Sequence, residues 1–104
     1  MAVTADKKVM IVSTPGHVAN HLSIIVEMEE IYYFIAGDTS YTEGNMLKLV
    51  PDGIGTGQSL NTLNSILSFT ESNPTIYLPS HDPQVPYRME NKMIVPRPME
   101  TVIN

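Results

Sequence analysis

The N-terminal part of the chain contains three short apolar runs, at residues 9–12, 22–27 and 31–36, rich in the β-branched and aromatic side chains that favour strands. Only residues 28–30 separate the second run from the third, a connection of hairpin length, so these two are predicted to pair as antiparallel neighbours. The third run is apolar on both faces, which is typical of an interior strand that is covered on both sides.

The longest helical pattern lies between residues 59 and 72. Ser59 is a plausible residue to cap its N-terminus, and Pro74 is expected to close it, because proline cannot continue a helix. The apolar residues that fall close to one helical stripe are Leu60, Leu63, Ile66, Leu67 and Phe69.

Shorter elements complete the pattern. Residues 42–50 predict a short helix, ended by a Pro-Asp-Gly turn at 51–53, and residues 75–78 predict a further strand. The segment 83–104 is rich in proline and is predicted to be an irregular C-terminal segment, with at most a short helix or strand near 89–95. The whole chain, 1–104, is predicted to be a single domain of the α/β (α+β) class.

Composition and charge argue against several classes of function. A formal charge of −5, with scattered Lys and Arg, argues against nucleic acid as a partner. The apolar runs are far shorter than the roughly 20 residues needed to cross a membrane, so no membrane association is expected. The chain has 0 cysteines, which excludes disulfides and thiolate metal sites. No secretory signal is expected from the first residues either, and the predicted location is cytoplasmic.

Candidate chemistry lies in three polar patches that follow predicted strands: Thr14-Pro15-Gly16-His17, Gly37-Asp38-Thr39-Ser40-Tyr41 and Ser80-His81-Asp82. Imidazole and carboxylate groups are common ligands of zinc and similar cations, and a carboxylate can bridge two of them. Taken singly, each patch is also ordinary turn chemistry. The adjacent Ser80, His81 and Asp82 are not a catalytic triad, because a triad is defined by the geometry of distant residues.

Taken together, the patches resemble the C-terminal half of the metallo-β-lactamase superfamily, and within it the N-acyl-homoserine lactonase-like branch. The intervals are similar to those of the branch, with 21 residues from His17 to Asp38 and 43 from Asp38 to His81. The resemblance implies half of an αββα sandwich, with a short mixed sheet and about two helices.

The resemblance also implies roles for single residues. His17 and His81 resemble metal ligands, and Asp38 resembles the carboxylate that bridges two metals. Tyr41 resembles the active-site tyrosine that contacts the lactone, and Asp38 shares the catalytic role. His21 matches a histidine behind the ligands, with an orienting role. The implied cofactor is zinc, two ions per complete site, although other divalent metals suit the same ligands.

The implied reaction is that of a quorum-quenching hydrolase, in which a metal-activated hydroxide attacks a lactone or ester carbonyl. The chain has no His-x-His-x-Asp-His cluster, which supplies four of the usual ligand positions in the superfamily. The resemblance therefore implies a truncated enzyme that is incomplete without the half carrying this cluster. Its small-molecule partner is a lactone or ester, and its protein partner is a second copy of the chain or a complementary N-terminal half.

Two alternatives stay open. The chain could be a non-catalytic remnant or oligomerising interaction module with at most weak metal binding. It could also be an unrelated small α/β domain in which the motifs are coincidental. Metal content and lactone hydrolysis distinguish the first alternative from the enzyme.

Overall fold

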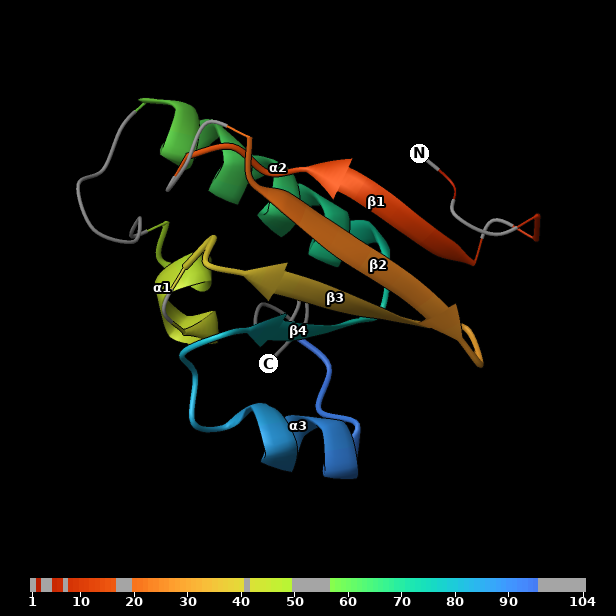
Figure 1. Cartoon of the computed structure of the whole chain (residues 1–104). Coiled ribbons are helices and arrows are strands. Elements are labelled where there is room, and N and C mark those ends of the chain that lie inside the picture. Colours follow the sequence, from red (N-terminus) through yellow and green to blue (C-terminus); the bar gives the residue numbers. More distant parts are fainter. Residues whose placement is uncertain are drawn as a thin grey trace.

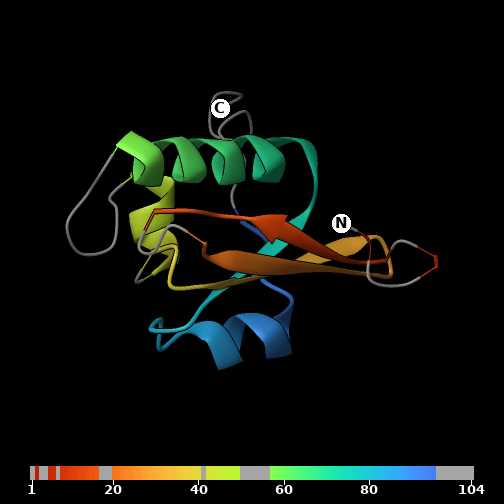
Figure 2. The same cartoon turned by 45° about the horizontal axis from the view of Figure 1, so that its top comes forward.

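The computed structural model describes residues 2, 5–6, 8–16, 20–40, 42–49 and 57–95. They form one mixed sheet with helices packed on its two faces (Figure 1). Figure 2 shows α2 on one side of the strands and α3 on the other. The elements are β1 (Val9–Ser13), β2 (Leu22–Met28), β3 (Ile31–Gly37), α1 (Glu43–Leu47), α2 (Gly57–Ser72), β4 (Thr75–Pro79) and α3 (Val85–Asn91).

The four strands follow chain order across the sheet, β1-β2-β3-β4. β1 pairs with β2, and β2 with β3, in antiparallel fashion, whereas β3 and β4 are parallel. The predicted hairpin is confirmed, and its two turn residues, Glu29 and Glu30, have φ values of 53° and 66°, as a two-residue turn with matching twist requires. β3 is an interior strand, as its apolar pattern predicts.

The α2 helix begins earlier than predicted. Its first residue is Gly57, so Ser59 lies inside the first turn and is not the residue before the helix. Ser59 also makes a tertiary contact: a Cβ at Gly16, where φ is 153°, would lie 2.6 Å from the Ser59 Oγ. A buried small side chain at Ser59 therefore packs against the turn after β1. The predicted short helix and the end of α2 before Pro74 are confirmed.

The segment 83–104 differs from the irregular structure predicted for it. The third helix, α3, occupies Val85–Asn91, whereas about two helices were expected in the whole chain. Pro86 stands in the first turn of α3, where its missing N–H costs no helical hydrogen bond. Lys92, in a left-handed conformation with φ 51°, ends the helix. Residues 96–104 lie outside the described part of the chain.

The core lies between the sheet and α2. Phe69 of α2 meets the rings of Tyr32 and Phe34 edge-on, with centroid distances of 5.4 and 6.0 Å. Such aromatic pairs add to the stabilisation from apolar burial. The buried residues of this core are Ile25, Phe34, Ala36, Met46, Leu63, Ile66, Tyr77 and Val95.

The opposite face of the sheet is apolar and only partly covered. Leu22, Ile24 and Met28 alternate along β2 and are 57%, 39% and 51% exposed. Ile35 of β3, which pairs with Ile24, is 43% exposed on the same face. Near this face α3 packs mainly against β4 among the strands described. We call these four residues the open sheet face. Among the described helices, none is long and apolar enough to span a bilayer.

Candidate metal centre

Two of the predicted metal ligands meet at one edge of the sheet. Because β3 and β4 are parallel, their C-terminal ends lie side by side, and Gly37 pairs with Pro79. The Ser80 amide donates to the Gly37 carbonyl at 2.8 Å, which aligns the two following turns. As a result the His81 Nε2 lies 3.1 Å from the Asp38 Oδ1. Residues 43 positions apart in the chain thus form one polar pair.

This pair is open to solvent. The His81 side chain is 60% exposed and that of Asp38 is 38% exposed. An imidazole nitrogen and carboxylate oxygens are donor types that zinc and related divalent cations accept. The pair therefore has the chemistry and the accessibility of a partial metal site.

His21 lies behind Asp38 and holds its backbone. The Asp38 N–H donates to the His21 Nε2 at 3.1 Å, so the ring proton is on Nδ1, which lies 2.9 Å from the Thr14 Oγ1. Ser23 donates its hydroxyl proton to the Ala36 carbonyl, so Thr14 donates to the Ser23 Oγ at 2.8 Å. The donor and the acceptor of each hydrogen bond in this chain are therefore assigned.

Both nitrogens of His21 are therefore engaged within the protein. The imidazole occupies the place of an orienting residue and has no lone pair left for a cation. Gly37 makes the approach possible, because a Cβ there would lie 2.8 Å from the His21 Nε2 and the backbone φ is 59°. A side chain at position 37 would both clash and strain the backbone.

Asp82, next to His81, belongs to a buried cluster. Its Oδ2 accepts hydrogen bonds from the Glu43 backbone N–H at 2.9 Å and from the Arg88 Nη2 at 2.8 Å, and its Oδ1 accepts from the Gln84 N–H at 2.8 Å. Burial alone would raise the pKa of Asp82, but the three donors outweigh it and hold the pKa below its usual range. The Arg88 Nε also donates to the Tyr77 carbonyl at 3.2 Å. The turn carrying His81 is thus joined to α1, α3 and β4.

Glu43 adds a second acid to this cluster. Its Oε2 is buried, has no hydrogen-bond partner among the described residues, and lies 3.9 Å from the Arg88 Nε. Burial raises the pKa of the Glu43 carboxyl, and the nearby Arg88 charge only partly opposes this. One arginine therefore faces two carboxylates in this cluster.

A buried tyrosine holds the segment after Asp38. The Tyr77 hydroxyl lies 2.6 Å from the Thr39 Oγ1 and 2.9 Å from the Ser40 Oγ. Ser40 donates in turn to the Thr42 carbonyl at 2.8 Å. Burial raises the pKa of the Tyr77 phenol, so the group stays a neutral donor and acceptor. The contact links β4 to the turn that carries Asp38.

The predicted site is only partly visible. His17 and Tyr41 lie outside the described residues, so their predicted roles as ligand and substrate contact stay predictions. In the described ranges, no group of three or more His, Asp or Glu side chains could hold a metal. Asp38 and His81 fit a cation by donor type, and they supply two side chains toward it.

Sequence reasoning missed the supporting residues. Asp82 stands in one of the three polar patches, but nothing in the sequence pattern marks Arg88 or Glu43 as its partners. Their signal was weak, because a buried Asp–Arg pair six positions apart has the same sequence appearance as two surface charges.

The structure was compared with known proteins. The sequence matches no protein-family model and no curated protein. The fold is similar to a solved N-acyl homoserine lactone hydrolase with the product N-hexanoyl-L-homoserine bound at its catalytic metal center. The TM-score is 0.67 and the identity 24%, over 88% of this chain and 35% of that one. The chain carries part of the lactonase fold.

Two further structures agree. A B. thuringiensis AiiA mutant with N-decanoyl-L-homoserine bound at the active site gives a TM-score of 0.67 and 24% identity, over 88% of this chain and 35% of that chain. A quorum-quenching N-acyl homoserine lactone hydrolase gives a TM-score of 0.62 and 25% identity, over 74% of this chain and 33% of that chain. The resemblance to this branch of the metallo-β-lactamase superfamily is confirmed for the fold. The chain spans about a third of these lactonases, less than the half that the motifs implied.

Proposed function

We propose that this chain is the part of a metal-dependent, lactonase-like hydrolase that supplies Asp38, His81 and His17 to the metal site. The observation that carries the proposal is the 3.1 Å contact between the His81 Nε2 and the Asp38 Oδ1 within a partial lactonase fold. Zinc is the expected metal, because the donors are an imidazole and a carboxylate.

Asp38 and His81 would hold the cation from adjacent strand ends. When bound, a divalent metal would supply Lewis-acid activation of water and of a lactone or ester carbonyl. The chain's own residues fix where the donors stand. His21 accepts the Asp38 N–H, and the Tyr77 hydroxyl anchors the residues that follow, so the backbone that carries the proposed carboxylate ligand is held in place.

Asp38, His81 and His17, shared between two metals, do not complete either site, so we propose a protein partner as well. Structural zinc sites take four ligands and catalytic ones take three protein ligands. The open sheet face, with Leu22, Ile24, Met28 and Ile35 exposed, is the surface that a complementary N-terminal lactonase segment or a second copy would cover. The same face also supports the second candidate function, a non-catalytic oligomerising module.

The test is zinc binding measured by calorimetry, followed by hydrolysis of N-hexanoyl-homoserine lactone. Both are measured with the chain alone and with a lactonase segment carrying His-x-His-x-Asp-His added in trans. We expect weak zinc binding alone, tighter binding and turnover with the added segment, and loss of both in Asp38→Asn and His81→Ala.

Glu71→Gln removes an exposed carboxylate on α2 and serves as the matched control, with unchanged binding. Zinc binding that is equal in Asp38→Asn and in the native chain would contradict the proposed ligand. Self-association with no zinc binding under either condition would favour the interaction module.

A further inference from the structure

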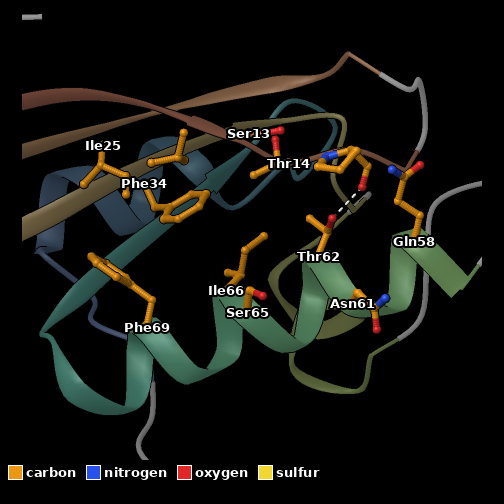
Figure 3. Close-up of a pocket in the computed structure, with 12 residues that line it drawn as sticks. Ser13, Thr14, Ile25, Phe34, Gln58, Asn61, Thr62, Ser65, Ile66 and Phe69 are labelled. Atoms are coloured by element: carbon orange, nitrogen blue, oxygen red, sulfur yellow. Dashed lines mark hydrogen bonds between the residues drawn. The ribbon is translucent and has the colours of Figure 1, made fainter. Parts of the chain in front are cut away.

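A cavity lies on the opposite side of the sheet from the open sheet face, between the strands and α2 (Figure 3). It has a volume of about 370 Å³. An apolar cavity of about 150 Å³ already binds benzene, and small-molecule sites in proteins begin at about 300 Å³. We call it the α2 cavity.

Contacts between described residues border the α2 cavity at both ends. At one end the Thr62 hydroxyl donates to the Pro15 carbonyl, the bond drawn as a dashed line in Figure 3. There the turn at Gly16 also approaches α2 so closely that a Cβ would meet Ser59. At the other end the rings of Phe34 and Phe69 meet, with centroids 6.0 Å apart. The space is therefore bordered by these contacts and is open to solvent between them.

The lining is apolar at the buried floor of the cavity and polar at its exposed mouth. The floor is apolar and buried, with Ile25, Phe34 and Ile66 at 7%, 3% and 2% exposure. The exposed residues of the lining are uncharged and polar, namely Ser13, Gln58, Asn61 and Ser65. Among the lining residues that the structure describes, there is no Asp, Glu, Lys or Arg. An ionic ligand would be desolvated there without a charged partner, which is costly.

We propose that the α2 cavity binds a small uncharged molecule with an apolar body of about ten carbons and one hydrogen-bonding group. The apolar body lies against Ile25, Phe34 and Ile66, and the polar end faces the hydroxyl and amide groups of the mouth. Binding needs neither a metal nor Asp38, so this proposal can be tested independently of the hydrolase proposal. Thr14 lines the cavity and also hydrogen-bonds His21, which in turn accepts the Asp38 N–H, so two residues separate the ligand from Asp38.

The test uses 2-naphthol, which has a ten-carbon aromatic body, one hydroxyl and no charge at neutral pH. Its binding to the 104-residue chain is followed by fluorescence and by NMR shifts. Ser65→Phe fills the cavity from its exposed side, and we expect it to weaken binding by about tenfold or more, because the added ring occupies the ligand's volume. Ser68→Phe makes the same change on α2 at an exposed position outside the lining and should bind as the native chain does.

The anion 2-naphthoate should bind the native chain about tenfold more weakly than 2-naphthol, because its charge finds no partner. If Ser65→Phe does not unfold cooperatively, Ile66→Phe fills the cavity from its floor and replaces it in the comparison. The proposal is overturned if 2-naphthol does not bind, or if it binds the filled and control variants equally. It is also overturned if the ligand-free chain dimerises and Ser65→Phe separates the dimer, since the occupant is then a second copy.

Discussion

Two polar clusters lie one peptide bond apart and differ in almost every physical respect. In the first, Asp38 and His81 form a single contact and are 38% and 60% exposed. In the second, the side chains of Asp82 and Arg88 are 4% and 9% exposed, and Asp82 accepts three hydrogen bonds. The boundary between them falls between His81 and Asp82, in the turn after β4.

The two clusters therefore differ in role: the buried one stabilises the fold, and the exposed one offers donor atoms to a ligand. The buried Asp82 carboxylate is hydrogen-bonded within the chain, so it stabilises the fold and holds the turn. The exposed pair keeps donor atoms accessible, which adds little stability but leaves them available to a cation. A site built from this chain therefore has a rigid base and an incomplete ligand set.

The largest effect on stability is expected at Arg88. Arg88→Met leaves the buried Asp82 and Glu43 carboxylates without their cation, and we expect a loss of about 3–5 kcal/mol in the free energy of unfolding. Urea denaturation measures it. The double variant Arg88→Met with Asp82→Asn should recover part of the loss, because the uncompensated charge is gone. Additive losses in that cycle would show that the two side chains do not interact.

A smaller loss is expected at His21. His21→Leu leaves the Asp38 N–H without an acceptor and removes the donor to the Thr14 Oγ1, which should cost about 1–3 kcal/mol in unfolding free energy. Zinc affinity should also fall by about 10–100-fold, because the proposed ligand Asp38 loses its support. Ser23→Ala breaks the same hydrogen-bond chain farther from Asp38 and is the control for stability alone. Unchanged zinc affinity in His21→Leu would remove His21 from the site.

The Tyr77 hydroxyl is expected to contribute less. Tyr77→Phe removes its hydrogen bonds to Thr39 and Ser40 but keeps the buried ring, so the free energy of unfolding should fall by about 1–2 kcal/mol. Thermal unfolding followed by circular dichroism gives the value. Tyr87→Phe removes an exposed hydroxyl and should change nothing measurable. Equal effects of the two variants would mean that the Tyr77 hydroxyl does not hold the Asp38 turn.

The smallest effect on stability is expected at the exposed pair itself. His81→Ala should shift the free energy of unfolding by no more than about 0.5 kcal/mol, because the side chain is mostly in solvent. Zinc binding should be lost in the same variant, and Ser80→Ala should leave it intact. A destabilisation of His81→Ala close to that of Arg88→Met would erase the distinction between the two clusters.

Sequence reasoning predicted the fold better than the site. The three N-terminal strands, the hairpin at Glu29 and Glu30, and α1 followed from local patterns, since hydrophobic periodicity and turn residues act over a few positions. The start of α2 did not, since Ser59, expected to cap the helix, lies inside its first turn. The α3 helix was predicted only as one possibility and too late in the chain, because Pro86 suggested a break where the first turn of a helix tolerates proline.

The sequence by itself determined the strand ends and the residue types placed there: His17, Asp38 and His81, each after an apolar run, in an order that resembles lactonases. Tertiary structure alone decided which of them meet. Asp38 and His81 become neighbours only because β3 and β4 pair in parallel, and His21 turns toward Asp38 only because Gly37 leaves it space. Asp82 is buried and supports the fold, whereas His81 beside it is exposed. Burial depends here on packing across the sheet and not on local sequence.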